Sequence, residues 1–150
     1  IPINRSCLDQ TTNDRTISGA SPRFTIPEPG LEEDGHLTEV RALDISTGRE
    51  AWRYSQRAPN MGSTLATAGN VVFFGDLNRR LRAFDAETGT VLWETILGSQ
   101  ITGYPVTYAV GGRQYLTVPV GGVNNNLATY TPELEAPNGS NMLVTFALPN

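Results

Sequence analysis

The sequence of 150 residues contains no lysine, one histidine and one cysteine. The single Cys7 has no partner for a disulfide within the chain, and the C-x-x-C-H motif for haem attachment is absent. All eleven basic side chains are arginines, and the net charge is −4, which argues against a polybasic surface for nucleic acid or anionic lipid. No apolar run is long enough for a transmembrane helix. We therefore expect neither a nucleic-acid-binding protein nor a helical membrane protein.

The sequence does contain a motif that occurs twice. The pattern A-x-D-x-x-T-G-x-x-x-W spans residues 42–52 and again residues 83–93. The two aspartates, Asp44 and Asp85, lie 41 residues apart, and so do the two tryptophans, Trp52 and Trp93. A repeat of about 40–45 residues is typical of a β-propeller in which each repeat forms one four-stranded blade.

Each copy of the motif is suited to a hairpin between two strands. The glycine, Gly48 or Gly89, stands where a tight turn requires a positive φ angle. The aspartate can accept hydrogen bonds from the amides of the threonine and the glycine across the turn. The small alanine leaves room on one strand, so that the large tryptophan of the other strand can dock between neighbouring blades.

The alternation of apolar runs and turn residues predicts an all-β chain. We expect blades of four antiparallel strands, with blade pieces at residues 1–54, 64–96 and 105–148 in one partial β-propeller domain covering residues 1–150. The first and last pieces lack strands that the middle piece has, which suggests a cut from a longer protein. Arg5–Gly35 shows no clear period, and we expect it to be a long loop.

The order of strands within each piece predicts which end of the blades carries function. Connections from a fourth strand to the next first strand, and from a second to a third strand, emerge at the same end of an antiparallel blade. The long segments rich in Gly, Pro and Asn all fall there: Arg5–Gly35, Ser55–Ser63, Gly98–Gly103 and Gly121–Ser140. Binding and catalytic residues concentrate on loops held by a rigid scaffold, so we expect this end to be functional.

Several segments resemble one known family. The two D-x-x-T-G-x-x-x-W hairpins resemble the tryptophan-docking repeats of the quinoprotein dehydrogenase propellers. Gly62–Gly75 resembles their G-x-x-x-T-A-G-x-V-F-x-G segment. Ile101–Tyr108 with Gly112–Tyr115 resembles their I-x-x-P-x-T-Y…G-x-Q-Y segment. The closing Phe146–Pro149 is similar to the C-terminal end of the membrane glucose dehydrogenase branch and related alcohol dehydrogenases.

The resemblance implies an eight-bladed propeller, of which this chain would form about three C-terminal blades. Members of the family are periplasmic and oxidise alcohols or sugars with pyrroloquinoline quinone (PQQ) and a bound cation, usually Ca²⁺. Their electrons pass to a cytochrome or to ubiquinone. Expected partners are the remaining blades, or other copies of the chain that associate through the open blade edges.

The resemblance also suggests cofactor-binding residues in one connector. In relatives the loop that enters the inner strand after Pro59 reaches the quinone, and Met61 stands where many have Trp. We therefore expect Asn60, Met61 and Gly62 to bind the cofactor, since an amide and backbone N–H groups are suitable donors. The alternative is that Asn60 only caps a turn, and both readings stay open. The catalytic and metal-binding residues of the family lie in earlier blades, so we assign none here.

Other polar residues have simpler interpretations. Asp44 and Asp85 belong to turns at the end opposite the long connectors, and a lone histidine, His36, is more often a surface or packing residue than a catalyst. We expect an exposed charged edge at Arg79, Arg80 and Arg82. The acidic residues of the first long segment are expected to solvate it: Asp9, Glu28, Glu32, Glu33 and Asp34.

Two functions compete at this point. One is a piece of a PQQ-dependent alcohol or sugar dehydrogenase that supplies scaffold and loops on the cofactor side. The alternative is a non-catalytic propeller for binding or assembly with tryptophan-docking repeats. Long connectors at one end favour the dehydrogenase, because a bare scaffold needs only short turns. The 150 residues alone are expected to be inactive.

Overall fold

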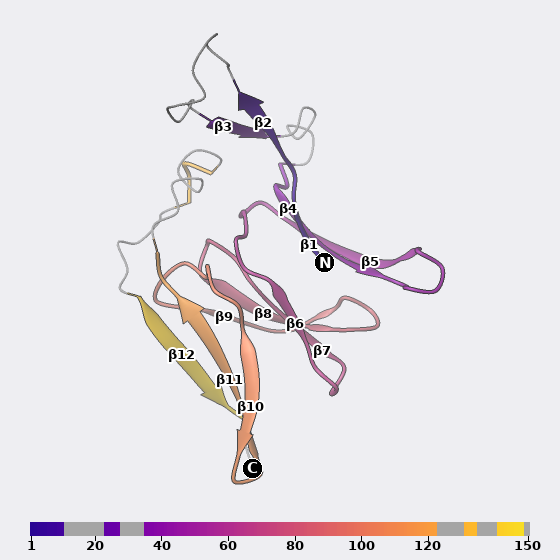
Figure 1. Ribbon diagram of the computed structural model, residues 1–150, viewed down its shortest axis with the longest axis vertical. Coiled ribbons are helices and arrows are strands. Elements are labelled where there is room, and N and C mark those ends of the chain that lie inside the picture. The colour runs from indigo at the N-terminus through magenta and orange to yellow at the C-terminus, as the bar shows by residue number, and fades with distance from the viewer. Residues whose placement is uncertain (11–22, 28–34, 123–130, 135–140, 149–150) are drawn as a thin grey trace, which may run out of the picture.

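The computed structural model describes residues 1–10, 23–27, 35–122, 131–134 and 141–148, and its regular elements there are all strands paired antiparallel (Figure 1). Three strands pair in the order β1 (Pro2–Asn4), β4 (Thr38–Leu43), β5 (Glu50–Gln56). Four strands form the next sheet in chain order: β6 (Thr64–Ala66), β7 (Val71–Gly75), β8 (Arg80–Asp85) and β9 (Val91–Ile96). The third sheet has β10 (Val106–Val110), β11 (Arg113–Val120) and β12 (Met142–Ala147). This all-β arrangement agrees with a partial β-propeller.

The expectation that Arg5–Gly35 is a loop is wrong in part. A separate hairpin forms there from β2 (Ser6–Gln10) and β3 (Arg23–Pro27). The hairpin lies beyond the first sheet, at the top of Figure 1. Strands of five residues are too short for a periodicity to distinguish them from irregular chain. Cys7 and Asp9 lie in β2. The acidic positions 28–34 and the asparagines 124–126 are outside the described residues.

The predicted turn chemistry is present in both copies of the motif. In the second copy, Oδ1 of Asp85 accepts hydrogen bonds from the backbone N–H of Glu87 (3.0 Å) and from the N–H (2.8 Å) and Oγ1 (3.0 Å) of Thr88. The Gly89 amide differs from expectation, because it donates to the backbone carbonyl of Asp85. Gly89 has a φ of 71°. The turn at Asp44 has the same pattern, so the motif stabilises a tight β8–β9 or β4–β5 turn.

Trp52 lies between the first and second sheets, as predicted. Its Nε1 donates to the carbonyl oxygen of Ala86, 2.8 Å away, in the β8–β9 turn. Its ring stacks on Phe84 with centroids 6.0 Å apart. A Cβ atom added to Gly89 would stand 2.6 Å from Cδ2 of Trp52, so the indole lies directly on the glycine. The motif of one sheet therefore docks on the motif of the next.

Two apolar cores join the three main sheets. The first core fills the space between sheets β1-β4-β5 and β6–β9, and its buried members are Val40, Trp52, Phe74 and Phe84. The second core joins sheets β6–β9 and β10–β12, and its buried members are Leu81, Leu97, Ile101, Leu116, Val118 and Val120. Each sheet is thus buried on the faces that meet a neighbour, which is how propeller blades stack.

The hairpin between β6 and β7 is one residue longer than the sequence suggested. In the sequence, Gly69-Asn70 between two apolar runs is typical of a two-residue hairpin turn. Instead, Thr67 N–H donates to the Val71 carbonyl (2.9 Å), which leaves three residues in the loop. Asn70 takes the positive φ (60°), a conformation that asparagine tolerates better than most residues.

Candidate functional site

The connector from Arg57 to Ser63 leads from the first sheet to the second. It follows β5 and precedes β6 (Figure 1). Ala58 and Asn60 are buried, with exposed fractions of 6% and 4%, whereas Met61 is 49% exposed. The connector therefore exposes the apolar side chain of Met61 next to residues that are buried.

Three consecutive carbonyl groups of this connector are hydrogen-bonded to three different segments. Their donors come from the end of β5, from the turn after β7 and from β1. The pairs are Gln56 Nε2 to the Ala58 carbonyl (2.9 Å), Leu77 N–H to the Pro59 carbonyl (3.0 Å) and Asn4 Nδ2 to the Asn60 carbonyl (2.8 Å). Hydrogen bonds to three successive buried carbonyl groups fix the course of the connector.

The side chain of Asn60 holds the turn itself. Its Nδ2 donates to the Gly62 carbonyl (3.1 Å), and its backbone N–H donates to Oδ1 of Asn4 (3.2 Å). That same Oδ1 accepts a bond from Oγ1 of Thr38 (2.9 Å). Asn60 therefore performs the capping role that the sequence left open as an alternative. Its contact with a cofactor stays a prediction, and Met61 is the exposed side chain of the three predicted residues.

Gly62 lies where two connectors pass each other closely. A Cβ atom at this position would stand 2.7 Å from the carbonyl oxygen of Gly103, which belongs to the connector between β9 and β10. Real Cβ atoms do not approach a carbonyl oxygen this closely, so glycine is required here for steric reasons. The connectors of two neighbouring sheets are consequently packed together at this end.

The expectation of an exposed edge at Arg79, Arg80 and Arg82 is wrong for Arg82, which is only 6% exposed. Its Nη1 donates to Oδ2 of Asp76 (2.8 Å) and to Oε1 of Gln56 (2.7 Å). Its Nε is 2.6 Å from Oε2 of Glu94, and its guanidinium lies 5.5 Å from the centre of the Tyr54 ring. Arg82 therefore links the second sheet to the first beneath the connector.

Burial controls the electrostatics of this cluster. Burial raises the pKa of the Asp76 carboxyl above its ordinary value, against the opposing effect of the hydrogen bond from Arg82. Burial also raises the pKa of Tyr54. For Arg82 burial is the largest single influence and acts to lower the pKa, but the hydrogen bond and charge of Asp76, together with the charges of Tyr54 and Glu94, outweigh it, so that the pKa is raised. The guanidinium is therefore a permanent cation that offsets the charge of the carboxylates around it.

The turn after β7 connects this cluster to the next connector. The Asp76 carbonyl accepts hydrogen bonds from the N–H groups of Ile101 (3.1 Å) and Arg79 (3.2 Å), and Leu97 N–H donates to the Arg79 carbonyl (2.8 Å). Arg79 has a φ of 67°, a strained value for a residue other than glycine. Asp76–Arg79 thus joins the connectors on both sides of the second sheet.

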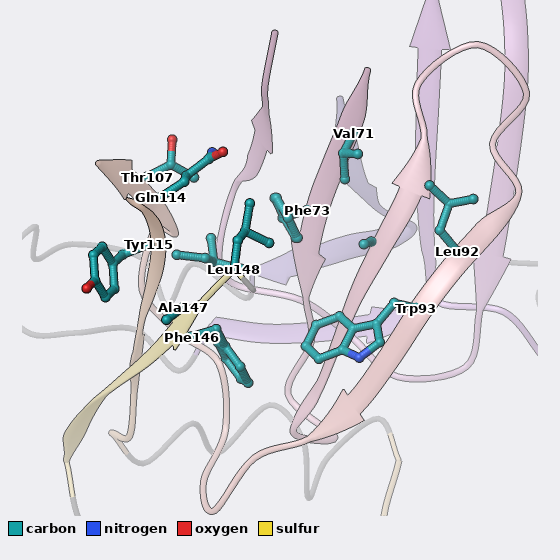
Figure 2. A pocket seen from close by; sticks show the side chains of 12 residues that line it. Val71, Phe73, Leu92, Trp93, Thr107, Gln114, Tyr115, Phe146, Ala147 and Leu148 are labelled. Carbon is teal, nitrogen blue, oxygen red and sulfur yellow. The ribbon is translucent and has the colours of Figure 1, made fainter. Parts of the chain in front are cut away.

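A pocket of about 400 Å³ lies between the second and third sheets (Figure 2). Trp93 and Phe146 meet edge to face across it, with centroids 5.4 Å apart, and Trp93 is 39% exposed. Ala83 pairs with Phe73 in the second sheet, and Ala147 pairs with Tyr115 in the third. Ala147 therefore occupies the position in the third sheet that Ala83 occupies in the second. The position that corresponds to the Ala86 acceptor of Trp52 is then Asn150, outside the described residues. The pocket is therefore the second tryptophan site of the repeat.

Other candidates in the described residues carry no site. In this part of the chain no group of three or more His, Cys, Asp and Glu side chains could hold a metal ion. Asp44 and Asp85 are occupied in their turns, and hydrogen bonds from Ser46 and Thr88 lower their respective pKa values. The search of the same residues for a helix able to cross a membrane found none.

Sequence reasoning missed the residues that support the connector. Asn4, Gln56, Asp76 and Arg82 are each polar residues within or next to strands, and a single sequence gives no sign that they converge.

Comparisons with known proteins give one consistent family. Residues 55–116 match the model of the family described as "PQQ: Glucose/ethanol/alcohol dehydrogenase, beta-propeller domain". The quinoprotein alcohol dehydrogenase PedH of Pseudomonas putida is 39% identical over 130 residues, which is 84% of this chain and 21% of that protein. The 1-butanol dehydrogenase (cytochrome c) of Thauera butanivorans is 44% identical over 71% of this chain and 15% of its own length.

A solved structure supports the same relationship. The structure of a europium-containing methanol dehydrogenase superposes with a TM-score of 0.66 and 26% identity, over 81% of this chain and 22% of that one. The chain thus spans only 15% to 22% of the length of these three relatives.

Proposed function

Since the chain corresponds to a fragment of the β-propeller of the PQQ-dependent alcohol dehydrogenases, we propose that it supplies three blades and part of the cofactor side of such an enzyme. The observation that supports this proposal is the connector at residues 57–63. The carbonyl groups of Ala58, Pro59 and Asn60 are all hydrogen-bonded and these three residues are buried, while Met61 beside them is exposed. We call the assembly of this chain with the remaining blades the complete propeller.

The residues of the connector fit one side of a planar cofactor. Met61 offers a polarisable thioether for contact with a flat ring, on a backbone that Asn60 and Gly62 hold in shape. PQQ, when bound, supplies a quinone that accepts the equivalent of a hydride from the alcohol. The contribution of this chain is to place and shield the ring, while the general base and the ligands of Ca²⁺ or another cation come from the remaining blades.

The open faces of the chain favour other blades over further copies as partners. On the outer face of β4 and β5, the buried Glu39 lies among the arginines Arg41 and Arg53. The outer face of the third sheet carries no ion pair among the described residues and is more apolar, with Tyr108 45% exposed and Leu143 70% exposed beside the hydroxyl groups of Thr117 and Thr145. Head-to-tail stacking of copies would bury the charged face against the apolar one, which is unfavourable.

We propose an alcohol as the substrate, because the relatives named above are alcohol dehydrogenases. A cytochrome is the proposed electron acceptor in place of ubiquinone, since the Thauera butanivorans relative is named for cytochrome c. Oxidation of sugars and a periplasmic location rest on the sequence resemblance alone. A non-catalytic assembly module is not favoured, because these relatives are dehydrogenases.

The test is an activity assay of the complete propeller with PQQ, Ca²⁺ or a lanthanide ion, and a primary alcohol, with reduction of a dye as the readout. We expect alcohol-dependent reduction that needs both PQQ and the cation. Absence of turnover with every cation and alcohol would overturn the proposal. Equal turnover without PQQ would also overturn it.

A further inference from the structure

Arg82 and Gln56 form a chain of contacts that ends at the connector. Arg82 Nη1 reaches Oε1 of Gln56 at 2.7 Å, and Nε2 of the same Gln56 amide reaches the Ala58 carbonyl at 2.9 Å. Arg82 is itself anchored on Asp76, which is fully buried. We propose that Gln56 and Arg82 are positioning residues that fix the connector, and so determine how far the Met61 side chain projects towards the cofactor. This inference rests on the function proposed above.

The geometry of the amide explains why glutamine is suited to this position. The Gln56 oxygen must accept from a guanidinium, and its nitrogen must donate to a carbonyl, so both ends of the amide are used in a fixed orientation. Gln56 is 7% exposed, and water therefore has little access to replace either partner. A buried polar group that loses its partner carries the full cost of its desolvation.

The contacts extend across sheets. Gln56 ends β5 of the first sheet, whereas Asp76 and Arg82 belong to the second. The residue after Asp76, Leu77, donates its N–H to the Pro59 carbonyl. Two adjacent carbonyls of the connector are thus set by the second sheet, one through the Gln56 side chain and one directly. A shift of the second sheet against the first would therefore move the connector.

The sharpest variant is Gln56→Glu in the complete propeller. A carboxylate keeps an oxygen for Arg82 but places a second oxygen, instead of a donor, against the Ala58 carbonyl. We expect the PQQ dissociation constant to rise by about fivefold to tenfold, because one hydrogen bond of about 1 kcal/mol is lost. We also expect faster hydrogen exchange at the Leu77 amide, because its acceptor on the connector loosens.

The neutral variant Gln56→Met removes both contacts without adding a charge, and it decides the test if Gln56→Glu does not fold. The matched control is Arg80→Gln, which removes the ion pair of Arg80 with Glu94, leaves the pair of Glu94 with Arg82 in place and removes no contact of the connector. We expect the control to change thermal stability but neither PQQ binding nor exchange at Leu77. If Gln56 had only a structural role, all three variants would change thermal stability, and none would change PQQ binding or hydrogen exchange at Leu77.

The outcomes separate this inference from the proposed function. Unchanged PQQ affinity and unchanged exchange at Leu77 in both Gln56 variants would overturn the positioning role. A wild-type complete propeller that does not bind PQQ would overturn the proposed function and, with it, the role toward the cofactor. Faster exchange at Leu77 with unaltered PQQ affinity would show that the connector moves without facing the cofactor, and it too would overturn the inference.

Discussion

The indole nitrogen of Trp52 and the carbonyl oxygen of Ala86 are 2.8 Å apart, so a side chain of the first sheet is hydrogen-bonded to a turn of the second. Replacement Trp52→Phe keeps a ring in the same place but removes the donor. We expect the complete propeller to lose about 1–3 kcal/mol of stability, because the bond is lost and a carbonyl is left without its partner. Chemical denaturation measures this loss. An unchanged transition would show that the bond contributes nothing to the joining of the sheets.

The glycine beneath Trp52 provides a second test. Gly89→Ala combines a positive φ, which costs about 1–3 kcal/mol for alanine, with a Cβ atom 2.6 Å from the indole. The control Gly111→Ala has a φ of 58° but meets nothing within 4 Å. We expect the thermal midpoint to fall for both variants and clearly further for Gly89→Ala. Equal losses would mean that the indole moves aside freely.

Gly62 tests the packing of the two connectors. In Gly62→Ala the new methyl group would meet the Gly103 carbonyl at 2.7 Å, so we expect the connector to shift, with weaker PQQ binding and lower stability. The control Gly69→Ala has no atom nearer than 3.9 Å and no positive φ, and we expect it to be neutral or stabilising by about 0.4–1 kcal/mol. Calorimetry and PQQ titration of both variants compare them. Wild-type behaviour of Gly62→Ala would contradict the close packing.

Asp76 and Arg82 form a buried ion pair whose disruption is expected to be costly. Asp76→Ala leaves the guanidinium without its main acceptor, and we expect a loss of about 3–5 kcal/mol in a denaturant titration. The control Glu133→Gln breaks the exposed pair with Arg57, and a change within about 1 kcal/mol is expected. Similar small losses of stability for both variants would contradict the expectation that breaking the buried pair of Asp76 and Arg82 is costly.

Asp85 predicts a specific dependence on pH. Hydrogen bonds from the backbone and side chain of Thr88 lower the pKa of Asp85 below its ordinary value of 3.8. A lowered folded-state pKa contributes stability above the unfolded-state value, and this contribution disappears as the pH falls through the folded-state pKa. We therefore expect the difference in thermal midpoint between wild type and Asp85→Asn to be largest near neutral pH and to shrink below about pH 4. A difference that does not change with pH would contradict the charged hydrogen-bonded turn.

The fold was largely predictable because its main signals are local. The Asp85 turn, the positive φ of Gly89 and the place of Trp52 all follow from one repeated motif of eleven residues. The hairpin of β2 and β3 was missed because five-residue strands in a polar segment carry no clear period. The loop between β6 and β7 was predicted to have two residues, Gly69 and Asn70, but it has three, because the chain closes with the hydrogen bond from Thr67 N–H to the Val71 carbonyl.

The candidate site was less predictable because its contacts join distant residues. Asn60 lies 56 positions from its partner Asn4, and Arg82 lies 26 positions from Gln56. Nothing in the sequence around Arg82 distinguishes a buried arginine from an exposed one. Its polar partners Asp76, Gln56 and Glu94 come from one turn and two different strands. The resemblance to a family located the connector, but only the structure showed that Met61 is exposed while Asn60 is used within the turn.

The most direct test of this account is an experimental structure of the complete propeller with PQQ bound. We predict that the Met61 side chain lies in van der Waals contact with the quinone, at about 4 Å, with the Gln56 amide still between Arg82 and the Ala58 carbonyl. A quinone bound away from the connector at residues 57–63, with Met61 facing solvent or another protein surface, would contradict it.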